Sequence, residues 1–94
     1  MNRERWKRHR KVVLDLFMAE WDPLGLDGAL RPRDEYDAYA MHAWKMAVVE
    51  GRPVADVAAY LVEVETEAFG LPARPDVARR IAETLVAMRL ARSI

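Results

Sequence analysis

The sequence predicts an all-α protein, built as a compact four-helix domain with mostly antiparallel neighbours. Apolar residues recur with the helical period of about 3.6. Proline, glycine and aspartate divide the chain into four such segments. No run alternates apolar and polar residues between turn signals, as a half-buried strand would. Because 94 residues suffice for one hydrophobic core, we expect a single domain over residues 1–94.

The first helix is expected over residues 3–21. Pro23 ends it, because the residue before a proline is pushed out of the helical conformation. Glycine, aspartate and proline then favour an irregular loop over residues 22–33 between the first and second helices. The apolar side chains of the first helix gather on one side at about 100° per residue; they are Trp6, Val13, Leu14, Phe17, Met18 and Trp21.

A second helix is expected over residues 34–50 and a third over residues 53–69. Asp34 can cap the free amides of the second helix with its carboxylate. Pro53 is tolerated at the first position of the third helix, where a backbone amide has no partner in any case. Gly70 closes that helix in a left-handed conformation.

The fourth helix is expected over residues 75–91, with one apolar stripe formed by Val77, Ile81, Leu85 and Met88. The connections that follow Gly51 and Gly70 are short. Short connections favour antiparallel packing of the helices that they join.

The formal charge is zero overall, but it is unevenly distributed along the chain. Residues 1–11 hold six Arg or Lys against one acid, residues 12–73 hold four against twelve, and residues 74–94 hold five against two. There is no cysteine, which excludes disulfides and thiol chemistry. The start has no apolar signal-peptide core, and no apolar stretch approaches the roughly 20 residues that span a bilayer. We expect a cytoplasmic protein without a membrane segment.

Two opposite charges are predicted to point into the core. Glu65 falls inside the apolar arc of the third helix, and Arg10 projects between the aromatic side chains of the first. Burying either charge alone costs several kcal/mol. We therefore expect Glu65 to pair with Arg10, or to accept hydrogen bonds from an indole, a phenol or backbone amides of the 22–33 loop. A structural role for this polar pair is preferred to a functional carboxylate.

The second helix is apolar over an unusually wide arc. One interpretation is that it lies centrally and packs against two other helices. The alternative is that Met41, Trp44 and Val48 form an exposed anchor for a partner or for a second copy, since Trp and Met are favoured at the centres of interfaces.

Catalytic, cofactor and metal sites are not recognisable in the sequence. The acids around the first loop lack the ligand spacing of a calcium loop, and the glycines form no phosphate-binding motif. His9 and His42 belong to no spaced ligand pair and are interpreted as ordinary surface residues. We predict no enzymatic activity, no cofactor and no metal.

Several short motifs follow one another along residues 12–71: Trp21-Asp22-Pro23-Leu24-Gly25, Asp34-Glu35-Tyr36-Asp37-Ala38-Tyr39, Tyr60-Leu61, Glu65 and Gly70-Leu71. Their order and spacing resemble the YugE-like family of small bacterial all-helical proteins of unknown function. The resemblance implies a compact helical fold and supplies no activity. Similar motifs occur in small helical proteins that look like toxin-immunity partners. Pro53 and Phe69 depart from the family pattern, and the last helix lies outside it.

The function expected from the sequence is a non-catalytic protein-binding module. Its partner is either an unknown protein or a second copy of the same chain. An immunity-type variant would bind a basic toxin domain through the acids Asp27, Glu35, Glu63 and Glu67, because complementary charge speeds association. One alternative is a nucleic-acid-binding accessory protein acting through its basic N-terminal and C-terminal helices, although a neutral chain with an acidic middle argues against it. The other is a small enzyme that uses Glu65 with a Tyr or His.

Overall fold

The computed structural model describes the backbone of residues 2–21 and 32–91, and the side chains of residues 4–21 and 36–90. The fold is all-α, as predicted. Its helices are α1 (Asn2–Leu16), α2 (Pro32–Trp44), α3 (Val54–Glu63) and α4 (Pro75–Ala91). The first three continue into π-helical turns, η1 (Phe17–Trp21), η2 (Lys45–Val49) and η3 (Val64–Ala68). Residues 22–31 of the predicted loop lie outside the described residues, whereas residues 32 and 33 belong to α2 and not to the loop.

Counted with these turns, each helix begins and ends within two residues of its expected bounds. The largest difference is at the start of α2, which begins at Pro32 and not at Asp34. Pro53 was expected at the first helical position of α3. It is instead the N-cap residue, one position earlier, and has an extended conformation. Proline is well suited there because its φ of −71° needs no strain and it has no amide that must be bonded.

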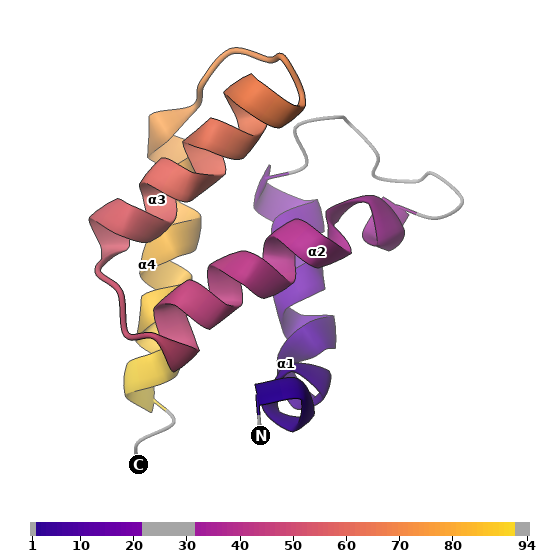
Figure 1. Cartoon of the computed structure of the whole chain (residues 1–94), viewed down its shortest axis with the longest axis vertical. Helices are drawn as coiled ribbons and strands as arrows, with labels where there is room; N and C mark the ends of the chain where they lie inside the picture. The colour runs from indigo at the N-terminus through magenta and orange to yellow at the C-terminus, as the bar shows by residue number, and fades with distance from the viewer. Residues whose placement is uncertain (1, 22–31, 92–94) are drawn as a thin grey trace.

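The helices form two layers. Figure 1 shows α2 and α3 in front, with α1 behind α2 and α4 behind α3. From the end of α3 the chain turns back, and α4 runs beside α3 in the opposite direction. Ala78 and Ala82, one turn apart on α4, are fully buried, and such small side chains let two helix backbones approach closely.

An aromatic core joins the layers. The predicted stripe of α1 and η1 is buried except for Met18, which is partly buried. Trp21 lies at its centre, with ring centroids 5.3 Å from Phe17, 5.4 Å from Tyr36 and 6.1 Å from Phe69. The core therefore connects α1, α2 and the segment after α3 around one indole.

Two helix ends share one geometry that the sequence only partly predicted. Gly51 and Gly70 adopt φ values of 67° and 65°, which confirms the left-handed conformation expected at Gly70. The amide after each glycine bonds a carbonyl six residues back, Arg52 to Met46 and Leu71 to Glu65, at 2.9 Å in both cases. In the usual glycine-closed end this bond spans five residues. The extra residue is the one that the π-helical turn inserts.

Candidate functional site

Glu65 is fully buried at the end of α3. Its exposure is 0%, the same as that of Val57 and Leu61 on the same helix. The prediction that this carboxylate falls inside the apolar arc is therefore confirmed. The π-helical turn η3 carries it, and π-helical turns are frequent where a protein places a functional side chain.

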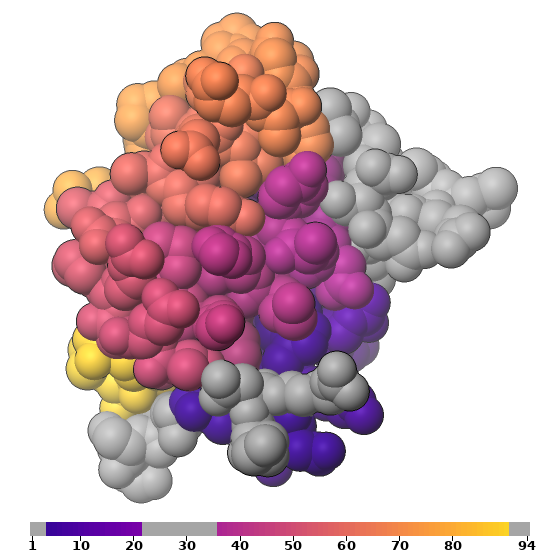
Figure 2. Space-filling model, in the orientation of Figure 1, coloured from indigo at the N-terminus to yellow at the C-terminus, as the bar shows by residue number. Residues whose placement is uncertain are grey.

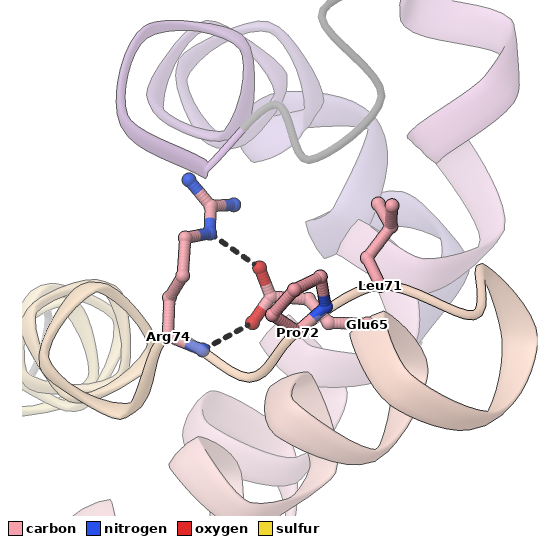
Figure 3. Close-up of a pocket in the computed structure, with 4 residues that line it drawn as sticks. All are labelled: Glu65, Leu71, Pro72 and Arg74. Atoms are coloured by element: carbon pink, nitrogen blue, oxygen red, sulfur yellow. Dashed lines mark hydrogen bonds and ion pairs between the residues drawn. The ribbon is translucent and has the colours of Figure 1, made fainter.

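The buried carboxylate is bonded by Arg74, in the segment that leads into α4 (Figure 3). The Arg74 Nε donates to Glu65 Oε2 at 2.7 Å, and the Arg74 backbone amide donates to Glu65 Oε1 at 3.3 Å. The Arg74 Nη2 donates to the backbone carbonyl of Trp21. One arginine thus joins η3, the start of α4 and the end of η1.

The expected pairing of Glu65 with Arg10 is wrong. Arg10 bonds Asp37 on α2 instead, at 3.1 Å, and both of these side chains are about 40% exposed. The reason is the packing of α1, which lies against α2 and turns Arg10 toward that helix. Arg74 is the first cation after Glu65 in the sequence and lies four residues beyond Gly70, and this short separation is the signal that could have identified it.

The carboxylate is not needed to form the turn that carries it. The segment Lys45–Pro53 has the same backbone hydrogen bonds as Val64–Pro72, and each ends in glycine, one further residue and proline. Met46 occupies the position in the first turn that Glu65 occupies in the second. Because the first turn forms with a buried methionine at this position, the specific contribution of Glu65 is its link to Arg74.

A small pocket lies beside this link. Glu65, Leu71, Pro72 and Arg74 line a cavity of about 200 Å³. Both carboxylate oxygens accept hydrogen bonds from Arg74, so the geometry supports a structural role for Glu65. None of the described Tyr or His side chains lines the pocket.

The expected exposed anchor on α2 is wrong for two of its three residues. Trp44 and Val48 are 1% and 3% exposed, while Met41 is 44% exposed. The Trp44 ring packs at 5.5 Å from that of Trp6, and its Nε1 donates to the Nδ1 of His9 at 3.1 Å. The alternative interpretation holds, in which α2 lies centrally between its neighbours.

His9 is half-buried and accepts a hydrogen bond from Trp44. It is therefore not the ordinary surface residue that we expected.

A different surface forms where α2 and α3 meet. Atoms of α2 and α3 adjoin one another across the middle of the face shown in Figure 2. His42 of α2 is exposed and lies 4.5 Å from the Tyr60 ring of α3. Tyr39 packs edge-on against Phe69 at 5.3 Å. Burial, with smaller contributions from the neighbouring Tyr39 and Glu63, raises the pKa of Tyr60 to about 12.

Tyr60 will ionise at a pH of about 12 and not at its ordinary 10.0. Because the folded pKa lies above the unfolded one, the stability that the neutral phenol contributes is present below pH 10 and is lost as the pH rises from 10 to about 12. An ultraviolet difference titration of the folded protein measures this step. The Tyr60→Phe variant removes it; a step that persists in this variant would belong to another tyrosine.

Glu63 and Glu67 are exposed one turn apart, on α3 and η3. Neither forms an ion pair with any described residue, whereas exposed acids such as Glu83 and Glu50 are paired with arginines. Asp27 and the side chain of Glu35, the other two acids proposed for binding, lie outside the described residues.

Several basic residues at the two ends of the chain interact with other side chains of the molecule. Arg5 lies over the Trp44 ring, 5.9 Å from its centroid. Four more basic residues of the two ends form ion pairs: Lys11 with Asp15, Arg10 with Asp37, Arg79 with Glu83 and Arg80 with Glu20.

In the described part of the chain, no three His, Cys or acidic residues are placed to hold a metal. The described helices include none that is long and apolar enough to cross a bilayer.

No family model matches the chain, and neither a curated protein nor a solved structure matches it.

Proposed function

We propose that this chain is a non-catalytic protein-binding module that binds a basic protein through the outer face of α3 and η3. The observation that carries the proposal is the position of Glu63 and Glu67. They lie at the C-terminal end of a helix, where the helix dipole disfavours negative charge. They are also four residues apart, a spacing at which like charges repel each other. Acids in a place that the fold disfavours are best explained by an interaction outside the fold.

The shape of this face suits a protein partner. Ala55 and Ala59 continue the row of Glu63 and Glu67 at intervals of four residues, and all four are exposed. Four residues advance a helix by about one turn, so the row forms one ridge. Two small residues followed by two acids allow a helix or loop to approach closely while its cations meet the carboxylates. The pairing would mainly accelerate association and select the partner.

An immunity-type role is the most specific form of this proposal. The resemblance to YugE-like proteins and to helical toxin-immunity partners supports a bacterial, cytoplasmic inhibitor whose target is a basic toxin domain. The internal ion pairs at the chain ends favour this proposal over nucleic-acid binding, because they lower the charge available to phosphates. The engagement of Glu65 by Arg74 likewise favours it over chemistry at Glu65.

Reversing both acids, Glu63→Lys with Glu67→Lys, will raise the Kd of the partner at least about tenfold. It will leave the melting temperature unchanged or raise it, since lysine suits a helix C-terminus. The protein retained from cell extract is identified, purified and titrated against each variant by calorimetry. Glu4→Lys with Glu83→Lys is the control, because it makes the same charge change on α1 and α4.

Two results would contradict the proposal. One is equal affinity of the purified partner for the α3 reversal and the control. The other is a large loss of melting temperature in the α3 reversal alone, which would show that the two acids serve folding.

A further inference from the structure

We propose that Tyr39, His42, Tyr60 and Glu63 form a subsite for one arginine side chain of the basic partner. We call these four residues the arginine subsite. The inference rests on the proposed function, and it adds the chemical identity of the group that is recognised. The subsite lies between α2 and α3, where the His42 and Tyr60 rings meet.

The two tyrosine rings of the arginine subsite are packed against neighbouring rings before any partner arrives. The Tyr60 ring is held by His42 at 4.5 Å with an interplanar angle of 41°. The Tyr39 ring is held by Phe69 at 5.3 Å and 80°. Glu63 follows Tyr60 by three residues, which places both on one side of α3. A site built on helices and supported by ring contacts is rigid, so little conformational entropy is lost on binding.

The polar groups of the arginine subsite suit a cation. The carboxylate of Glu63 and the phenol of Tyr39 each lie close enough to Tyr60 to raise the pKa of its phenol. The raised pKa of Tyr60 keeps its phenol neutral throughout the physiological range, so its oxygen can accept a hydrogen bond. Glu63 supplies the negative charge and has no cation of its own among the described residues.

The aromatic groups select arginine over lysine. A guanidinium is planar, stacks on aromatic faces and presents its donors as a fork that matches a carboxylate. The His42 ring is exposed and contacts the Tyr60 ring, and Tyr60 in turn lies near the Glu63 carboxylate, so the subsite offers an aromatic face and a negative charge together. A lysine ammonium would meet the same negative charge but would gain less from the rings and keep a stronger hydration shell.

Two peptides test this inference on the full chain. Each has eight residues with four cations separated by alanines, and they differ only in carrying arginine or lysine. Calorimetry at pH 8 gives the affinities, and ¹H–¹⁵N spectra locate the binding site. We expect the arginine peptide to bind about fivefold more tightly, with the largest spectral changes at His42, Tyr60 and Glu63.

Substitutions assign the preference to the subsite. Glu63→Gln will weaken the arginine peptide about tenfold and abolish the preference over lysine. The matched variant Glu67→Gln removes the same charge one turn away; it will weaken both peptides by about twofold and keep the preference. His42→Ala will lower the preference while retaining binding of the lysine peptide. Circular dichroism confirms that each variant is folded.

The possible failures are distinguishable. Equal binding of both peptides, lost in Glu63→Gln, overturns the arginine subsite and leaves the basic-partner proposal standing. Spectral changes elsewhere on the chain, or no binding of either peptide, also overturn the subsite. The wider proposal falls separately, when the purified partner binds the Glu63→Lys and Glu67→Lys variant as well as it binds the control.

Discussion

Replacing Arg74 with alanine will lower the free energy of unfolding by about 3 kcal/mol, because it leaves the buried Glu65 carboxylate without its cation. The side chain of Glu65 is 0% exposed, and the substitution removes the Nε bond to its Oε2 while the backbone amide of residue 74 still donates to its Oε1. Arg74 itself is 40% exposed, which places the effect at the lower end of the range for a broken buried pair. Chemical denaturation monitored by circular dichroism measures the change.

A double substitution separates an uncompensated charge from lost packing. Glu65→Met combined with Arg74→Leu will recover about 2 kcal/mol of the loss, since an apolar pair often replaces a buried ion pair without penalty. Methionine is chosen because Met46 occupies the equivalent position of the other glycine-closed turn. A double variant no more stable than Arg74→Ala would show that the charge of Glu65 is not the source of the penalty.

Arg10 provides the control for this prediction. Its ion pair with Asp37 is partly exposed on both sides, and such pairs contribute about 0–1 kcal/mol. Arg10→Ala should therefore cost much less than Arg74→Ala. Equal costs for the two variants would contradict the assignment of Arg74 as the partner of the buried carboxylate.

Replacing Trp21 with alanine will lower the free energy of unfolding by about 4 kcal/mol. The indole is 1% exposed and contacts rings from three parts of the chain. Removing the indole leaves a cavity, because the three neighbouring rings cannot move far enough to fill its volume. For a chain of this length the total stability is roughly 5–14 kcal/mol, so Trp21→Ala will melt far below the wild type in calorimetry.

Trp21→Phe will cost less, about 1–2 kcal/mol, because part of the ring volume is kept. The indole Nε1 is buried and makes no hydrogen bond within the described structure, so phenylalanine removes volume without breaking a bond. Met41→Ala is the surface control and should change stability by less than about 0.5 kcal/mol. If Trp21→Ala costs no more than Met41→Ala, the indole does not organise the core.

Local patterns were sufficient to predict the helices and one detail of the site. The bounds of all four helices followed from apolar periodicity and from Pro23, Gly51, Gly70 and Pro75, because each of these signals acts on its own neighbours. The burial of Glu65 followed from the same periodicity, since its angle on α3 places it among apolar residues. Both predictions need only the geometry of one helix.

The π-helical turns had no equivalent signal. At these helix ends each backbone hydrogen bond spans one residue more than in an ordinary α-helical end. The sequence around Met46 or Glu65 contains nothing that distinguishes such an end from an ordinary one. The shift has a consequence for the site, because one additional residue per turn rotates the side chains at the end of α3 relative to an ideal helix. This rotation is part of the backbone conformation of η3 that places the Glu65 carboxylate beside Arg74.

The sequence by itself determined an all-α fold, the extent of its helices and the inward direction of Glu65. Only the tertiary structure decided that Arg74, and not Arg10, is the partner of that carboxylate, and that Trp44 and Val48 are buried while His42 and Tyr60 meet at the surface. Periodicity states which side of a helix is apolar. Which neighbour covers that side depends on how the helices cross, and this is set by the packing of the whole core at once.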